Sequence, residues 1–143
     1  MKIEEILRTK GHEVVTITES QSILDAVQVL VDRNIGGLVV TDGQRPVGIL
    51  TERDILRLTA RSPGGFDSIT VASVMTREVI TGTPQDDLTS VMDTMTENKI
   101  RHLPVIADNQ LAGIISIGDL VHAFRVSAEA ENSQLRQYIQ GAG

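Results

Sequence analysis

Apolar positions near the start of the chain change from helical spacing to strand-like spacing and back. Their recurrence at every third or fourth position predicts a helix over residues 2–10. Residues 14–18 predict a short strand. The next apolar stripe predicts a helix that opens at Ser20 or Ser22, both good N-cap residues, and ends at Asn34.

Two continuous apolar runs follow and predict a pair of buried strands. They cover residues 38–41 and 47–50, and unbroken runs of this kind are typical of strands that are buried on both faces. Asp42-Gly43, between the two runs, is a hairpin turn signal. Thr51 then begins a further helix that extends through about residue 60.

This pattern occurs twice in the chain. Shifting the sequence by 65 positions places residues 14–58 on residues 79–123 without a gap, so that Gly48 falls on Gly113. A duplicated unit of this size usually packs against its copy, because one unit alone cannot bury its apolar face. The sequence therefore predicts an α/β (α+β) fold made of two tandem β-α-β-β-α repeats.

The second copy predicts the same elements in the same order. Its first strand falls at residues 79–83, and its first helix runs from about residue 86 to residue 98. Its strand pair covers residues 103–106 and 111–116, and a last helix starts near Ser116. The groove between two such copies is a natural place for paired ligand sites.

Turn residues and the repeat limits divide the chain into four segments. Residues 1–62 hold the N-terminal helix and the first repeat, and residues 63–70 form a linker that contains Pro and Gly. Residues 71–124 hold the second repeat, and residues 125–143 form a C-terminal helical tail. This tail, with three apolar residues on one side, would either close the core or contact a second subunit.

Composition and charge exclude several classes of function. The formal net charge of −6 argues against a nucleic-acid-binding protein, which would carry a basic face. The chain has no cysteine, which excludes disulfides and thiolate metal sites. It has one Tyr and two Phe, too few for an aromatic platform that stacks bases. No apolar run reaches the roughly 18 residues that a membrane span needs, and the first residues show no signal-peptide pattern, so we expect a cytoplasmic location.

A hydroxyl residue followed three positions later by an aspartate ends the strand pair of each repeat. The two segments are Gly48-Ile49-Leu50-Thr51-Glu52-Arg53-Asp54 and Gly113-Ile114-Ile115-Ser116-Ile117-Gly118-Asp119. One interpretation is a helix capping box. The other uses the same geometry, because a helix N-terminus suits a phosphate and the aspartate can accept hydrogen bonds from ribose hydroxyls. The two interpretations are compatible, since a cap in the free protein can become a ligand contact.

Together with this motif, two other segments make the chain resemble a pair of cystathionine beta-synthase (CBS) domains. They are Asn98-Lys99-Ile100-Arg101-His102-Leu103-Pro104-Val105 and Val71-Ala72-Ser73-Val74-Met75-Thr76. The resemblance covers about residues 2–124. It implies two repeats packed sheet to sheet as one pseudo-symmetric module, with additional N- and C-terminal helices. Because no catalytic domain is attached, the chain resembles a stand-alone CBS-pair protein.

The resemblance also implies up to two adenosine-nucleotide sites in the cleft between the repeats. The first would contain Thr51, Arg53, Asp54, Thr76, Ile80, Ile100, Arg101 and His102. The second would contain Ser116, Asp119, Val15, Ile35, Gly36 and Gly37. AMP is the first ligand to expect, and ADP, ATP, NAD(H) and S-adenosylmethionine are the others; no metal is expected.

The two sites differ in charge. Arg53, Arg101 and His102 surround the expected phosphate in the first site. The second site has glycines at the equivalent positions, which permit close backbone approach but supply no charge. We therefore expect the first site to hold a phosphate more tightly, and the second to bind weakly, to bind a neutral adenosine moiety or to stay empty.

These features predict a regulatory module that senses adenine nucleotides, and with them cellular energy or redox state. The alternative is a dimerisation or protein-interaction scaffold that binds no ligand. An enzyme is not expected, because the sequence shows no nucleophile–base pair, no metal-ligand spacing and no Walker or Rossmann glycine loop. The expected partners are an adenosine-containing small molecule, a second copy in a homodimer and an unknown effector protein, with neither nucleic acid nor membrane.

Overall fold

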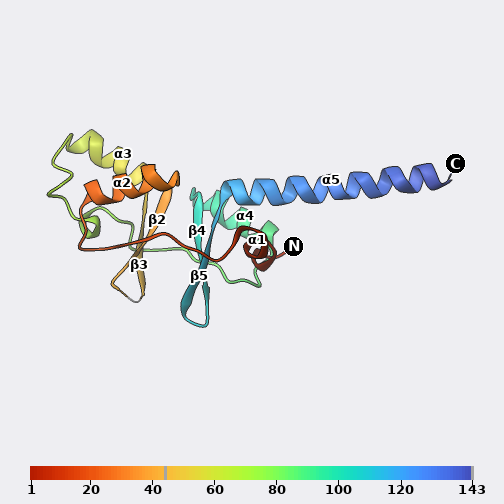
Figure 1. The fold of residues 1–143 in the computed structure, drawn as a ribbon, viewed down its shortest axis with the longest axis horizontal. Coiled ribbons are helices and arrows are strands. Elements are labelled where there is room, and N and C mark those ends of the chain that lie inside the picture. Colours follow the sequence, from red (N-terminus) through yellow and green to blue (C-terminus); the bar gives the residue numbers. More distant parts are fainter. Residues whose placement is uncertain (44, 143) are drawn as a thin grey trace.

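The computed structural model describes residues 1–43 and 45–142 and shows two similar α/β halves followed by a long helix (Figure 1). The elements in chain order are α1 (Ile3–Lys10), β1 (Thr16–Thr18), α2 (Ile23–Arg33), β2 (Gly37–Thr41), β3 (Pro46–Thr51), α3 (Glu52–Arg61), a 3-10 turn η1 (Val71–Ser73), α4 (Leu88–Glu97), β4 (His102–Ala107), β5 (Gln110–Ser116) and α5 (Ile117–Ala142). The two β-hairpins lie side by side, with the helices along one edge of the molecule.

Local signals set the ends of α2 as the sequence predicts. Ser22, rather than Ser20, is the N-cap, and its side chain forms a capping box with Asp25. Asn34 ends the helix in the left-handed conformation, with φ of 52°, which asparagine tolerates better than most residues. The predicted order of helices and strands in the first repeat is confirmed.

The two sheets are not identical. In the first, β2 lies between a parallel β1 and an antiparallel β3, whereas the second contains the antiparallel pair β4 and β5. The strand expected at residues 79–83 is reduced to one parallel bridge between Gly82 and Val105. These two residues are the counterparts of Ile17 and Val40, which pair in the first sheet. The topology is therefore conserved between the repeats, but pairing stops at once because Pro84 lacks an N–H to continue it.

Each half of the molecule has its own hydrophobic core, and the segments that precede the repeats cross over between them. Helix α1 packs into the core of the second repeat, where Leu7 is fully buried against β5 and α4. The segment after α3 packs into the core of the first repeat through Val71 and Met75. Helix α1, which precedes the first repeat in the sequence, therefore packs with the second repeat in space. These two exchanged segments, α1 and the segment after α3, connect the repeats into one module.

The last helix of the second repeat and the expected C-terminal tail are one continuous helix, α5. Its second half extends away from the two sheets (Figure 1). The three apolar residues of the tail, Leu135, Tyr138 and Ile139, are 59%, 76% and 69% exposed. These three residues therefore do not close the core, which was one of the two roles expected for the tail. No helix in the described ranges has the length and apolarity needed to cross a membrane.

Candidate ligand-binding cleft between the repeats

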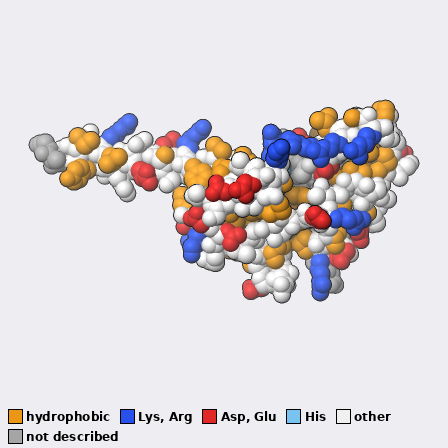
Figure 2. Space-filling model, turned by 180° about the vertical axis from the view of Figure 1, so that it is seen from behind, with side chains coloured by type: hydrophobic (Ala, Val, Ile, Leu, Met, Phe, Trp, Pro, Cys, Tyr) orange, Lys and Arg blue, Asp and Glu red, His pale blue; other side chains and the backbone are white. Residues whose placement is uncertain are grey.

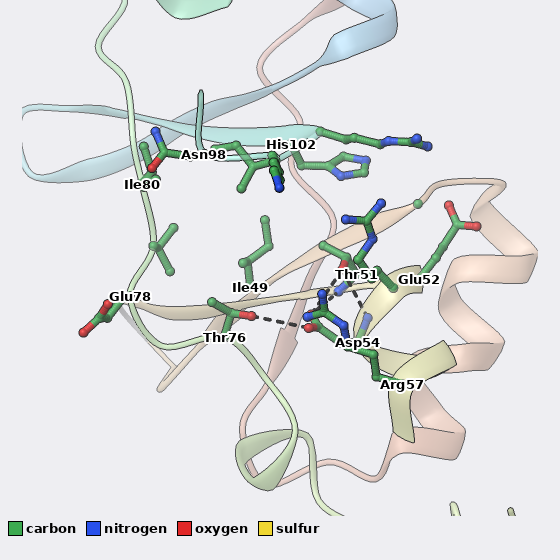
Figure 3. A pocket seen from close by; sticks show the side chains of 16 residues that line it. Ile49, Thr51, Glu52, Asp54, Arg57, Thr76, Glu78, Ile80, Asn98 and His102 are labelled. Atoms are coloured by element: carbon green, nitrogen blue, oxygen red, sulfur yellow. Dashed lines mark hydrogen bonds between the residues drawn. The ribbon is translucent and has the colours of Figure 1, made fainter. Parts of the chain in front are cut away.

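A cavity of about 480 Å³ lies between the two repeats, and Figure 3 shows the side chains that line it. Its volume is within the range of about 300–1,000 Å³ that is typical of small-molecule sites. The structure brings all eight residues predicted for the first site to its wall. They are Thr51, Arg53, Asp54, Thr76, Ile80, Ile100, Arg101 and His102.

The hydroxyl and aspartate of the first motif form a capping box at the start of α3. The Thr51 backbone N–H donates to Asp54 Oδ2 at 2.9 Å, and the Asp54 N–H donates to Thr51 Oγ1 at 3.4 Å. The other carboxylate oxygen, Oδ1, accepts a 3.4 Å hydrogen bond from Thr76 Oγ1. The capping interpretation therefore describes the structure, and the same carboxylate faces the cavity (Figure 3).

Thr76 joins the segment after α3 to the edge of β3. Its backbone exchanges two hydrogen bonds with Ile49, of 3.0 and 2.9 Å. Gly48 makes this approach possible, because a Cβ there would lie 2.7 Å from Met75 Sδ and 2.9 Å from the Thr76 carbonyl oxygen. The cavity floor is thus held by backbone pairing.

Isoleucine side chains form the apolar part of the cavity wall. Ile80 lies on the opposite side of the cavity from Glu52 in Figure 3. Ile49 and Ile100 also line it, so three isoleucines contribute apolar surface to the cavity. Such an arrangement suits a ligand with an apolar ring at one end and a polar group at the other.

His102 packs its imidazole ring over the backbone of Gly36 and Gly37. A Cβ on Gly37 would lie 3.1 Å from His102 Cγ. Glycine at these positions therefore leaves room for the imidazole ring of His102, a residue of the first predicted site. Burial lowers the pKa of His102 below its ordinary value, although the charge of Glu52 acts in the opposite direction. The ring is therefore mainly uncharged at pH 7, and the permanent positive charge of the cleft comes from other residues.

The sequence reasoning missed two cationic residues of the cavity, Arg57 and Lys99. Arg57 lies one helical turn after Arg53 on α3, a spacing that could have been read from the sequence. Lys99 could not have been placed so easily, because it adopts the left-handed conformation with φ of 55°. Glu52 and Glu78 also line the cavity and were not predicted.

The second motif forms an equivalent cap at the start of α5, but its aspartate has an additional partner. The Ser116 N–H donates to Asp119 Oδ2 at 2.8 Å. Lys10 Nζ lies 2.7 Å from the same oxygen and donates to the Ile114 carbonyl at 2.8 Å. A lysine of α1 thus contacts the strand end and the aspartate together, as Thr76 does in the first repeat.

The other residues predicted for the second site do not line the cavity described above, with the exception of Gly36. Val15 and Ile35 are partly buried against the core of the first repeat. Gly37 lies beneath the His102 ring. The residues of the first predicted site therefore line one cavity. Those of the second, apart from Gly36, do not, and its aspartate, Asp119, forms an ion pair with Lys10.

The Lys10–Asp119 pair predicts a pH-dependent contribution to stability. Burial on its own raises the pKa of Asp119, but the hydrogen bonds from Lys10 and Ser116 and the lysine charge outweigh it, so the pKa lies below its ordinary value of 3.8. The carboxylate therefore stabilises the fold above about pH 4, and this contribution is lost as the pH falls through the lowered pKa. We expect Lys10→Met to lower the free energy of unfolding by up to about 1 kcal/mol at pH 7, and to cost less below pH 4.

Denaturant unfolding at several pH values tests this expectation. Arg33→Met is the matched control, because the Arg33–Glu13 pair is 3.7 Å long and both side chains are well exposed. A loss in Lys10→Met that stays constant down to pH 2 would contradict the assignment to Asp119.

Residues that could hold a metal do not gather anywhere in the described ranges. No group of three or more His, Cys, Asp or Glu side chains there has a metal-binding arrangement. The imidazole ring of His12 forms a hydrogen bond instead, because its Nδ1 donates to the Ala112 carbonyl at 2.9 Å. The cleft instead offers basic side chains, three carboxylates and isoleucine side chains.

Comparison with known proteins links both halves of the chain to one family. The CBS domain family model matches residues 3–61 and 71–126. The mitochondrial CBS domain-containing protein CBSX3 of Arabidopsis thaliana is 36% identical over 148 residues, which cover 97% of this chain and 72% of that protein. The CBS domain-containing protein YhcV of Bacillus subtilis is 34% identical over 128 residues, or 89% of each chain.

Solved structures show the same fold, some with a ligand bound. The CBS-domain containing protein ATU1752 of Agrobacterium tumefaciens matches with a TM-score of 0.83 and 36% identity over 86% of this chain and 98% of that one. Protein PAE2072 of Pyrobaculum aerophilum, solved with AMP, matches with a TM-score of 0.74 and 27% identity over 83% and 89%. The CBS domain pair of protein MJ0100, solved with 5-methylthioadenosine and S-adenosylmethionine, matches with a TM-score of 0.76 and 27% identity over 87% and 99%.

Proposed function

Because this chain belongs to the CBS domain family and carries two copies of the domain, we propose that it is a regulatory module that binds an adenosine-containing ligand. The binding place is the cavity between the repeats. One observation carries the proposal: eight residues from three separate segments of the sequence, 51–54, 76–80 and 100–102, line a single cavity. Relatives solved with AMP, 5-methylthioadenosine or S-adenosylmethionine support the class of ligand.

The chemistry of the wall suggests how such a ligand lies. Asp54 accepts hydrogen bonds from the ribose hydroxyls, replacing its contact with Thr76. Ile80 and Ile100 hold the adenine ring by apolar contact. The phosphate lies towards the start of α3, where Arg53 extends from the first turn of the helix.

Regulation would follow from the position of the cavity. A ligand there contacts α3 of the first repeat and the start of β4 in the second. It can shift the packing of the repeats by as much as its affinity differs between two arrangements. We propose an effector protein or a second copy of the chain as the reader of that shift.

The exposed side of α5 supports the alternative, a scaffold for a homodimer or another protein. Leu135, Tyr138 and Ile139 are exposed in the far half of this helix, and apolar residues that gather on one surface commonly mark contact sites. This function does not exclude ligand binding. A cytoplasmic location and the absence of enzymatic activity remain predictions from the sequence, and one of the relatives is described as mitochondrial.

A thermal-shift screen of AMP, ADP, ATP, NAD⁺, NADH and S-adenosylmethionine tests the proposal. A ligand at 100 times its dissociation constant adds about 2.7 kcal/mol to the free energy of unfolding. For a chain of this length we expect a rise in melting temperature of roughly 5–10 °C with at least one ligand. No shift with any of the six, for protein shown to be free of co-purified nucleotide, would contradict nucleotide binding and favour the scaffold.

A further inference from the structure

Four permanent cations surround the cleft cavity, two from each repeat. Arg53 and Arg57 extend from α3, one helical turn apart, and Lys99 and Arg101 belong to the segment that leads into β4. We call these four residues the basic cluster. Figure 2 shows Lys and Arg side chains gathered in a band that runs from the junction of the repeats over the first repeat.

In the part of the chain that the structure describes, none of the four side chains of the basic cluster forms an ion pair or a hydrogen bond. The cavity is also lined by three carboxylates, Glu52, Asp54 and Glu78. Asp54 is engaged by Thr51 and Thr76, and Glu78 lies across the cavity from Arg57 in Figure 3. The four permanent cations outnumber the three carboxylates, so the formal charge of the cavity wall favours an anion from solution.

The pseudo-symmetry of the chain provides an internal control for the role of this charge. Each position of the basic cluster has a counterpart 65 residues away in the other repeat, and none of these counterparts carries a permanent charge. They are Gly118, His122, Asn34 and Gly36, the counterparts of Arg53, Arg57, Lys99 and Arg101 in that order. The fold forms without permanent cations at these four counterpart positions. It therefore does not require cations at the positions of the basic cluster.

We infer that the cleft selects adenosine ligands that carry two or more linked phosphates, such as ADP, ATP or an NAD-type dinucleotide, over AMP. This inference rests on the proposed function. A single phosphate can be held at the start of α3 by Arg53 with Arg101 opposite. A second phosphate brings further charge within reach of Arg57 and Lys99, and phosphate oxygens form the strongest hydrogen bonds with such donors.

The same geometry assigns a mechanical role to the phosphate chain. Arg57 belongs to the first repeat and Lys99 to the second. A linked pair of phosphates that contacts both residues bridges the cleft, whereas a monophosphate held mainly at α3 does so less completely. S-adenosylmethionine, whose sulfonium is positive, is repelled by the basic cluster.

Binding calorimetry with adenosine, AMP, ADP, ATP and NAD⁺ tests the inference, in low salt and without divalent cations. For the wild-type chain we expect ADP, ATP or NAD⁺ to bind at least about tenfold more tightly than AMP. Comparison of ATP with NAD⁺ separates a nucleoside polyphosphate from a dinucleotide. The preference should shrink at high salt, because exposed charges are screened.

Two substitutions remove the charge that the second phosphate needs. Lys99→Asn places at φ of 55° the residue that its counterpart Asn34 already is, so the backbone is preserved. Lys99→Asn and Arg57→Gln are each expected to weaken ATP binding about threefold, and the double variant about tenfold. The affinity for AMP should change less than twofold in all three. Arg61→Gln is the matched control, since Arg61 is exposed on the last turn of α3 and does not line the cavity.

The outcomes separate this inference from the proposed function. AMP that binds as tightly as ATP and NAD⁺, or an equal loss for AMP and ATP in Arg57→Gln and Lys99→Asn, would overturn the inference and leave nucleotide binding intact. A loss of ATP affinity in Arg61→Gln of the same size would also overturn it, because the effect would then be one of overall charge. Absence of binding by every ligand would overturn both.

Discussion

Replacing Asp54 with alanine is expected to lower the affinity of the cleft for its adenosine ligand by about 10- to 100-fold. The proposed role of this carboxylate is to accept hydrogen bonds from the ribose, and a hydrogen bond to a charged group contributes about 1.5–3 kcal/mol. In the described part of the chain Asp54 Oδ1 accepts one long hydrogen bond, of 3.4 Å from Thr76 Oγ1, so the ligand displaces little. Titration calorimetry of wild type and variant with the ligand found in the screen measures the change.

The control must separate this loss from the loss of a helix cap. Asp54→Ala also removes the N3 side chain of a capping box, and the loss of its hydrogen bond with the Thr51 N–H lowers stability. Asp25→Ala removes the equivalent box of α2, formed with Ser22, and Asp25 does not line the cavity. We expect similar loss of stability in both variants but loss of binding in Asp54→Ala alone. Unchanged affinity in Asp54→Ala would contradict the role assigned to this residue.

The largest effect on stability is expected from Leu7→Ala. Leu7 is fully buried in the core of the second repeat. Its side chain packs on Gly113, where a Cβ would lie 2.6 Å from Leu7 Cδ2. Truncating a buried leucine leaves a cavity and costs about 2–5 kcal/mol. For a chain of this size the melting temperature should fall by roughly 10 °C.

Leu56→Ala makes the same chemical change on a surface, since Leu56 is 71% exposed on α3. It should alter the free energy of unfolding by less than about 0.5 kcal/mol. Amide hydrogen exchange then tests the crossed packing, because Leu7→Ala should loosen β4 and β5 more than β2 and β3. Faster exchange confined to the first repeat would mean that α1 belongs to that repeat instead.

The secondary structure was predictable because its signals are local. Ser22 lies three residues before its capping partner Asp25, and Thr51 three before Asp54. The offset of 65 residues then carried each assignment from the first repeat to the second. The first strand of the second repeat escaped this reasoning, since apolar matching does not show that pairing will stop at Gly82.

The first site was predicted from the resemblance to a known family. Its residues lie in three separate segments, 51–54, 76–80 and 100–102, and the resemblance joins them. Arg57 and Lys99 were missed because each is an ordinary surface residue until the cavity is in view. Only then does the contrast with their counterparts His122 and Asn34, which carry no permanent charge, acquire a meaning.

The sequence by itself determined the duplicated α/β architecture and the helix caps, because these depend on neighbours a few positions apart or on a repeat without gaps. The residues of the first site came from the resemblance to a known family. Only the tertiary structure decided which repeat each connecting segment completes. Lys10 and Asp119 are 109 residues apart, and their contact follows from the packing of α1 against the second repeat. No local pattern encodes such a contact, because the apolar pattern of α1 is compatible with either of two similar cores. Only the folded chain shows which core it joins.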